Sequence, residues 1–198
     1  MINIRYAQIR KMDISNGEGI GVSLFVQGCH FHCKNCFNSE TWDFDDGKEW
    51  TEEVKNEFLK LIDRPYIKRI SILGGEPLAD ENVSDILNLV NQIHLLFPNK
   101  TIWLYTGYTV NLSSYTYVDA DDDYKIKPLN YLYCKPVGTN TKSNLQRSGV
   151  LNLVDVVVDG RFEEDKKDLT LKFRGSSNQR VIDVKKSLEQ NKIVLWCD

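Results

Sequence analysis

The sequence predicts an α/β protein built around a parallel sheet. Between residues 22 and 106, short apolar segments rich in strand formers alternate with segments whose apolar residues recur at helical spacing. Parallel neighbours in a sheet need a crossover connection, usually a helix, so this order favours parallel pairing. Residues with chemical function directly follow the first two strands, which is typical of parallel sheets because their carboxyl ends carry the sites.

The first strand and helix are expected between residues 22 and 62. Strand formers fill residues 22–27, and Gly28 ends the run. A helix is expected to begin at about Thr51, whose hydroxyl suits an N-cap position. The apolar residues that follow share one helical face; they are Val54, Phe58, Leu61 and Ile62.

The second unit is the clearest in the chain. Residues 70–73 form a short buried strand that Gly74 and Gly75 stop. A helix follows, and Pro98 ends it. Its apolar positions are Val83, Ile86, Leu87, Val90 and Ile93. A third strand is expected at 101–106, so the chain reads as strand, helix, strand, helix, strand.

Residues 109–149 break this pattern, and we expect an elaborated, partly exposed insertion there. Its run at 119–123 carries four carboxylates and is typical of a solvated loop. Residues 139–148 are polar and rich in turn formers, whereas a short strand is expected at 131–133. Nothing in this stretch indicates a function.

The remaining residues complete one domain. Residues 154–158 predict a buried strand, and the tail from Arg161 is mixed and ends in an apolar patch at 193–196. At 198 residues the chain is long enough for a single well-packed domain, whereas two would be cramped. We therefore expect residues 1–198 to form one domain.

Composition excludes several classes of partner. The formal net charge of -3 argues against a nucleic-acid partner, because phosphate binding usually leaves a basic footprint. No apolar run approaches the roughly 20 residues of a membrane-spanning helix, so no membrane partner is expected. The first residues lack the basic start and apolar core of a signal peptide, which predicts a cytoplasmic protein.

The cysteines predict a metal or cluster site. The chain has five, an odd number, and three of them fall within eight residues, which disfavours a disulfide framework. Cys29, Cys33 and Cys36 form a Cys-x3-Cys-x2-Cys loop. A [4Fe–4S] cluster normally takes four cysteines. Three thiolates would leave one iron open to an external ligand, and an open iron is what a catalytic cluster needs.

Two alternatives stay open at this stage. Zinc could be held by the three cysteines together with His30 or His32, although structural zinc sites usually pair two separated hooks rather than one contiguous loop. Alternatively, Cys134 or Cys197 could complete the cluster and make it a plain electron carrier.

Several segments are similar to a known family. The cysteine loop resembles that of the radical S-adenosylmethionine superfamily. More narrowly, the chain resembles the anaerobic ribonucleoside-triphosphate reductase-activating proteins. The matching segments occur in family order: DISNGEG at 13–19, LFVQGC at 24–29, CFNSETW at 36–42, GGEPL at 74–78, IWLYTGY at 102–108, VDG at 158–160 and RGSSNQ at 174–179.

The chain also departs from the family pattern. The stretch between Tyr108 and Leu151 is longer than the usual helical connection, Glu18 stands where proline is common, and Phe37 stands where tyrosine is more usual. None of these changes touches the cysteines.

The resemblance implies a fold and a site. The fold would be an incomplete parallel (β/α) barrel of the radical S-adenosylmethionine type, with the insertion near 109–149. The cysteines would hold a [4Fe–4S] cluster, and S-adenosylmethionine would contact Asn35, Cys36 and Phe37 beside it and Gly75 at a strand end. Absence of side chains at Gly74 and Gly75 would let the cofactor lie against backbone.

Two roles are open for some residues of the matching segments. Glu76 would help neutralise the cofactor's positive charge or would serve as a helix-start carboxylate. The run at 174–179 would order the C-terminal tail or touch the reductase. No side chain is expected to act as a catalytic acid or base, since no convincing histidine–carboxylate pair stands out.

The resemblance also implies an activity. The cofactor would be split reductively to give a 5′-deoxyadenosyl radical, which would install a glycyl radical on class III (anaerobic) ribonucleotide reductase. A flavodoxin-type protein would supply the electron. The alternatives are an activator of another glycyl-radical enzyme, of the pyruvate formate-lyase type, and a non-catalytic zinc-binding adaptor.

Overall fold

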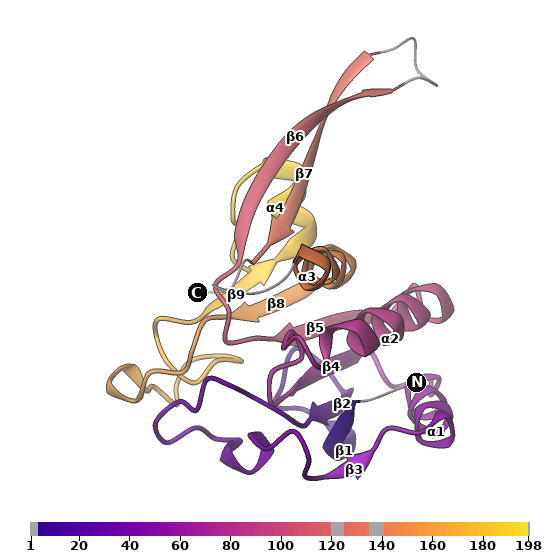
Figure 1. Cartoon of the computed structure of the whole chain (residues 1–198), viewed down its shortest axis with the longest axis vertical. Helices are drawn as coiled ribbons and strands as arrows, with labels where there is room; N and C mark the ends of the chain where they lie inside the picture. The colour runs from indigo at the N-terminus through magenta and orange to yellow at the C-terminus, as the bar shows by residue number, and fades with distance from the viewer. Residues whose placement is uncertain (1–3, 120–124, 135–140, 198) are drawn as a thin grey trace.

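A seven-stranded sheet forms the centre of the molecule in the computed structural model, which describes residues 4–119, 125–134 and 141–197 (Figure 1). The strand order is β3-β1-β2-β4-β5-β8-β9. The sheet strands are β1 (Arg5–Asp13), β2 (Gly21–Val26), β3 (Lys48–Glu49), β4 (Arg69–Gly74), β5 (Thr101–Tyr105), β8 (Val156–Asp159) and β9 (Arg180–Asp183). The helices are α1 (Glu52–Ile62), α2 (Val83–Leu96), α3 (Thr141–Leu153) and α4 (Val184–Gln190), with short 3-10 turns η1 (Ser39–Thr41) and η2 (Glu164–Lys166).

The sheet is mostly parallel, as predicted, but its edges are not. Strands β2, β4, β5 and β8 pair in parallel, with Gly21 opposite Arg69 at one end and Val26 opposite Gly74 at the other end of the first pair. Strands β1, β3 and β9 add antiparallel edges that the sequence analysis missed. Strand β1 lacks the apolar run of a central strand because it lies near an edge and much of it meets solvent.

Helices cover one face of the sheet. Side chains alternate between the two faces of a strand, so Ile70 and Ile72 of β4 point toward the helices while Arg69 and Ser71 point the other way. The main core is built on the helical face; its members include Leu24, Phe58, Ile62, Ile86, Val90, Leu104, Leu151, Val157 and Ile182. The opposite face carries a smaller cluster: Trp103, Val156, Val158 and Val181, with Phe173 and Trp196 packed against it.

The two predicted helices are present. Helix α1 begins after Thr51, whose hydroxyl accepts a hydrogen bond from the Val54 backbone N–H at 3.3 Å, the expected N-cap contact. Phe58, Leu61 and Ile62 are buried, as the helical spacing predicts. Helix α2 buries Val83, Ile86, Val90 and Ile93 as predicted. It buries Leu89 as well, whereas the predicted Leu87 is only partly buried against the core.

The insertion contains a β-hairpin that projects away from the sheet (Figure 1). Strands β6 (Asn111–Asp119) and β7 (Lys125–Tyr133) pair in antiparallel fashion, so the short strand expected at 131–133 is the end of a longer one. The Leu132 backbone N–H donates to Asn152 Oδ1 at 2.9 Å, and this contact ties the hairpin base to α3. Residues 120–123 of the predicted acidic loop lie outside the described residues.

A helix occupies residues 141–148 of the segment that was expected to be rich in turns, and residues 139 and 140 lie outside the described residues. Helix α3 contains serine, asparagine and a glycine, which are poor helix formers, and this composition concealed it. Arg147 holds the helix in place: it is fully buried, its Nε donates to the Leu78 carbonyl at 2.8 Å, and it pairs with Asp80. Helix α3 thus serves as the crossover into β8 and contacts the loop that follows β4.

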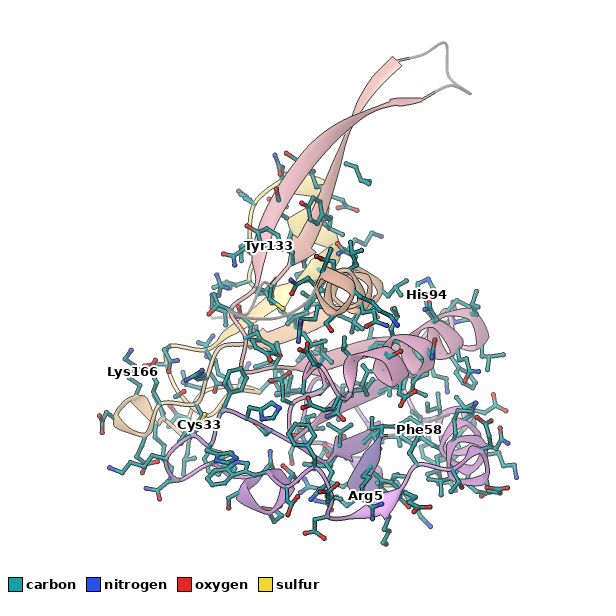
Figure 2. All side chains as sticks on the ribbon, viewed as in Figure 1. Arg5, Cys33, Phe58, His94, Tyr133 and Lys166 are labelled. Atoms are coloured by element: carbon teal, nitrogen blue, oxygen red, sulfur yellow. The ribbon has the colours of Figure 1, made fainter. Side chains whose placement is uncertain are left out.

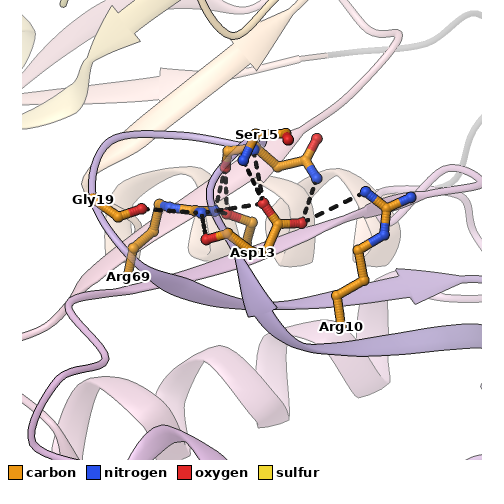
Figure 3. A network of polar contacts seen from close by, with 7 residues as sticks. Arg10, Asp13, Ser15, Gly19 and Arg69 are labelled. Carbon is orange, nitrogen blue, oxygen red and sulfur yellow. Dashed lines mark hydrogen bonds and ion pairs between the residues drawn. The ribbon is translucent and has the colours of Figure 1, made fainter.

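A buried ion pair organises the face without helices (Figure 3). Arg69 and Asp13 are 0% and 1% exposed, and Arg69 Nη2 lies 3.3 Å from Asp13 Oδ1. Arg69 also donates to the Asn16 carbonyl and to Ser71 Oγ. These bonds hold residues 13–19 across the sheet. Burial opposes ionisation of Asp13, but hydrogen bonds from Asn16 and Ser15 outweigh it and lower its pKa to about 2.

In the part of the chain that the structure describes, none of the helices has both the length and the apolar character needed to cross a bilayer.

Candidate metal centre and cofactor cavity

The three cysteines of the predicted cluster lie in one loop that follows β2. Cys29, Cys33 and Cys36 are all partly buried free thiols. His32 and Asn35 adopt left-handed backbone conformations, with φ of 46° and 55°, and so reverse the chain between successive cysteines. The Cys36 backbone N–H donates to the Cys33 carbonyl at 3.1 Å. Figure 2 shows Cys33 on the side of the molecule near Lys166, far from Phe58 and His94 of the helical face.

Backbone hydrogen bonds fix this loop to the segment after it. The Gly28 N–H donates to the Thr41 carbonyl and the Cys29 N–H to the Trp42 carbonyl, both at 2.9 Å. A side chain at Gly28 would overlap the Phe44 ring, and its φ of 91° also favours glycine. The loop is therefore held in place by the protein itself.

The cysteines share a cavity of about 520 Å³. It opens at the carboxyl ends of β2, β4, β5 and β8, where the order of strands and helices predicts a site. Its lining includes Phe25, Cys29, Phe31, Cys33, Cys36, Phe37, Gly74, Gly75, Glu76, Tyr105, Thr106, Gly107, Gly160, Arg161 and Arg174. Ligand pockets of roughly 300–1,000 Å³ are typical of small-molecule and cofactor sites. The cavity therefore has room for a nucleoside cofactor.

The alternative fourth ligands have other surroundings. His30 Nε2 lies 2.9 Å from Glu81 Oε1, and the His32 ring stacks on Trp42 with centroids 4.6 Å apart. Cys134 is buried in the core of the helical face, and Cys197 packs against the cluster around Trp103. The cavity lining includes neither of these cysteines. Three cysteines in one cavity fit a cluster bound by three thiolates.

Burial makes two of the three thiols, those of Cys29 and Cys33, less acidic than a free cysteine. It raises the pKa of Cys29 to about 11, and the nearby Glu76 and Cys33 raise it further. Burial and the neighbouring Cys36 also raise the pKa of Cys33. Metal binding would therefore displace thiol protons. Among the residues that the structure describes, no three cysteine, histidine or acidic side chains converge on a single metal-ion position.

Gly74 and Gly75 leave no room for side chains. Gly74 has a φ of 107°, and a Cβ there would lie 2.8 Å from the Val26 backbone. A Cβ at Gly75 would lie 2.4 Å from the Gly28 carbonyl oxygen. Both glycines line the cavity. Gly74 also lets β4 approach the end of β2, and Gly75 lets it approach the start of the cysteine loop. The predicted contact with a cofactor is therefore accompanied by a packing role.

We expect Gly75→Ala to destabilise the protein by about 1–3 kcal/mol, because its new methyl group must push the Gly28 backbone aside. Iron bound after reconstitution should fall as well. Gly149→Ala in α3 is the control, since its Cβ would meet only the end of Leu87 at 3.1 Å. Urea unfolding and iron analysis measure both effects. Equal stability of the two variants would contradict the packing role.

Glu76 is completely buried and bonded to the ends of two strands. Its Oε1 accepts hydrogen bonds from the Leu78 N–H at 2.9 Å and from Thr106 Oγ1 at 2.8 Å, and its Oε2 accepts one from the Gly107 N–H at 2.7 Å. Burial raises its pKa to about 7, although these bonds oppose the rise. The helix-start reading is wrong, because α2 begins only at Val83.

Of the other residues predicted to contact the cofactor, two line the cavity and one does not. Cys36 and Phe37 line the cavity, whereas Asn35 is exposed and the cavity lining includes Asn38 instead. The left-handed backbone of Asn35 gives it a part in shaping the loop. The sequence alone could not show which of the two asparagines lines the cavity, because the direction of each side chain depends on the conformation of the turn.

Three arginines that the sequence did not predict also line the cavity. Arg10 from β1, Arg161 and Arg174 all contribute to its wall. The Arg161 guanidinium lies 4.4 Å from the centre of the Phe31 ring, and its positive charge lowers the pKa of Cys33 against the effect of burial. The matching segment at 174–179 was a signal for this wall.

The same segment orders the tail, which was one of its two predicted roles. Gln179 Oε1 accepts hydrogen bonds from the backbone N–H groups of Gly175 at 2.9 Å and Ser176 at 3.2 Å. Gln179 Nε2 donates to the Gly160 carbonyl at 2.9 Å. The tail is therefore tied to the end of β8.

Comparison with known proteins identifies the family. Residues 15–182 match the family described as a 4Fe-4S single cluster domain. The chain is 36% identical over 180 residues to the anaerobic ribonucleoside-triphosphate reductase-activating protein of Salmonella typhi, covering 90% of this chain and 97% of that protein. Proteins of the same name from Escherichia coli K12 and Enterobacteria phage T4 are 34% and 32% identical, over 90% of this chain and 97% and 93% of their own lengths. The chain belongs to the family of anaerobic ribonucleoside-triphosphate reductase-activating proteins.

Proposed function

We propose that this protein is a radical S-adenosylmethionine enzyme that installs a glycyl radical on the catalytic subunit of anaerobic ribonucleotide reductase. Cys29, Cys33 and Cys36 hold a [4Fe–4S] cluster with one iron left open. When bound at that iron, S-adenosylmethionine would take up one electron, lose methionine by cleavage of its S–C5′ bond, and so supply a 5′-deoxyadenosyl radical to remove a hydrogen atom from a glycine of the reductase. The family names of the relatives and the shared cavity support this proposal.

The observation that carries the proposal is the meeting of three cysteines and the Gly74–Glu76 segment in one cavity. The two parts lie 38 positions apart in the sequence, from Cys36 to Gly74, and belong to different strand ends. Parallel pairing of β2 with β4 brings them together. The protein would position the cofactor and exclude water from it, while the cofactor carries the hard chemistry.

Each group of residues that lines the cavity has a role in the proposed mechanism. The backbone at Gly74 and Gly75 would face the methionyl part of the cofactor, and Cys36 and Phe37 would lie beside the nucleoside. The hydrogen bonds of Glu76 to Thr106 and Gly107 keep the ends of β4 and β5 together. No acid or base is needed, because a hydrogen atom moves rather than a proton.

The proposal extends to the domain organisation of the enzyme, its electron donor and its cellular compartment. The whole chain would act as a single domain, with its open sheet as the incomplete barrel of the superfamily. A flavodoxin-type protein would donate the electron. The cytoplasm would be its compartment, since free thiols persist in reducing conditions.

Anaerobic mixing with the cognate reductase tests the function. The protein is reconstituted with iron and sulfide, reduced, and supplied with S-adenosylmethionine and reductase. We expect an electron paramagnetic resonance signal of a glycyl radical in the reductase and methionine as a product. A reductase variant with alanine in place of the target glycine should give methionine without the signal.

The alternatives give different results in the same experiment. A radical on pyruvate formate-lyase but not on the reductase would assign the chain to the other activator type. Stoichiometric zinc, with no visible iron–sulfur absorbance after reconstitution, would establish the zinc-binding adaptor and reject the proposal.

A further inference from the structure

Apart from the three cysteines, the charged side chains that line the cavity are mostly positive. Three arginines and one carboxylate contribute to its lining. The carboxylate, Glu76, already accepts three hydrogen bonds from the chain, which leaves it little capacity for a ligand. The wall is therefore better suited to an anionic group of a ligand than to a cationic one.

The three arginines differ in their surroundings. Arg10 Nη1 lies 3.7 Å from Asp13 Oδ2, and its guanidinium lies over the Phe25 ring at 4.4 Å. Arg161 lies over the Phe31 ring. No side-chain hydrogen bond, ion pair or ring contact joins Arg174 to any residue within the described ranges, and its Nε is buried without a partner. A partly buried cation without an anion is costly, and a ligand could supply that anion.

The backbone around Arg174 is fixed. Phe173 has a φ of 62°, a conformation that a bulky residue rarely adopts, and its ring packs against Trp103 with centroids 5.1 Å apart. On the other side, Gly175 is bonded to Gln179 and to Asp168 through its N–H and its carbonyl. Rare backbone conformations held in this way are often found at ligand sites.

We propose that Arg174 binds the carboxylate of S-adenosylmethionine. This inference rests on the proposed function, which puts that cofactor in the cavity. The cofactor carries two cationic groups, an ammonium and a sulfonium, and one anionic group, its carboxylate. A guanidinium can donate two parallel, charge-assisted hydrogen bonds to a carboxylate, and such bonds are roughly twice as strong as neutral ones. Arg174 is thus a positioning residue that orients the methionyl end of the cofactor.

Equilibrium binding measurements distinguish binding of the carboxylate by Arg174 from a general structural role of this residue. Wild type and Arg174→Gln, both carrying the cluster, are titrated anaerobically with S-adenosylmethionine and with its decarboxylated analogue. We expect Arg174→Gln to weaken binding of S-adenosylmethionine by about tenfold or more, as loss of a charge-assisted hydrogen bond implies. Binding of the decarboxylated analogue should change less than about twofold, because the lost partner is absent from it.

Two further variants complete the test. Arg174→Lys should recover part of the affinity for S-adenosylmethionine, since a charge remains without the forked geometry. Lys172→Gln is the control: it removes a positive charge from the same segment, but Lys172 is exposed and does not line the cavity. Its affinities for both ligands should equal those of wild type.

Three results would overturn the inference. The first is unchanged binding of S-adenosylmethionine by Arg174→Gln. The second is an equal loss of affinity for both ligands, which would show a general structural effect. The third is unchanged affinity for both ligands together with weaker binding of the reductase, which would assign Arg174 to the partner. Failure of wild type to bind S-adenosylmethionine at all would instead refute the proposed function and this inference together.

Discussion

Alanine at any one of Cys29, Cys33 or Cys36 should abolish formation of methionine from S-adenosylmethionine under dithionite. Each thiolate would ligate a different iron of the cubane, so removing one leaves a second iron without a protein ligand. The three side chains share one cavity wall, and no other cysteine lines it. The visible absorbance of the reconstituted protein and its bound iron should fall to background in all three variants.

Cys134→Ala is the matched control for this set. Cys134 is 1% exposed and belongs to the core of the helical face, so its removal should leave iron content and methionine formation close to those of wild type. Substantial turnover in any of the three loop variants would reject the ligand assignment. Loss of the cluster in Cys134→Ala would revive a cluster closed by a fourth cysteine.

Asp13→Asn should destabilise the fold by about 3–5 kcal/mol, the usual cost of breaking a buried ion pair from one side. The substitution leaves the Arg69 guanidinium, which is 0% exposed, without its neutralising charge. It also weakens the turn in which the Ser15 and Asn16 N–H groups donate to Asp13 Oδ1 at 2.8 and 2.9 Å. Urea unfolding of the protein without its cluster measures the loss directly.

Glu49→Gln provides the control for Asp13→Asn, because it makes the same carboxylate-to-amide change in an exposed ion pair. Glu49 is 77% exposed and lies 3.7 Å from Arg5, so we expect a change below about 1 kcal/mol. A cost for Asp13→Asn as small as that of Glu49→Gln would refute the role of the buried pair.

The pH dependence gives a second check on Asp13. Its pKa is lowered to about 2 in the folded protein, against about 4 in an unfolded chain. A lowered pKa stabilises the fold at pH values above the unfolded pKa, and this contribution is lost as the pH falls toward 2. The stability difference between wild type and Asp13→Asn should therefore shrink as the pH is lowered from 5, and a constant difference would contradict the assignment.

Sequence patterns predicted the elements that are buried. Strands β2, β4, β5 and β8 are apolar because both of their faces are covered, and α1 and α2 show a clear helical period. Strand β1 and helix α3 were missed for the opposite reason. Their residues are polar or poor formers, and pairing with β2 in one case and packing on α2 in the other stabilise them.

The site was predicted to a similar extent. Spacing alone identified the three cysteines, since a short loop can bring its own side chains together. Arg174 and Arg161 belong to a distant segment that has no regular period, so only the fold shows that they share a wall with Cys33. The structural role of Glu76 was also missed, because its partners Thr106 and Gly107 come from the next strand.

Because the main core and the cysteine loop lie in different parts of the molecule, the stability of the fold should depend little on the cluster. Most of the buried apolar side chains lie on the face that carries the helices, and the cysteine loop is tied down by its own backbone bonds. We therefore expect the polypeptide to fold without iron, unlike small zinc domains, which are unfolded without their metal. If oxygen destroys the iron–sulfur cluster, the folded apoprotein should therefore remain. It should be able to take up a new cluster when anaerobic conditions return.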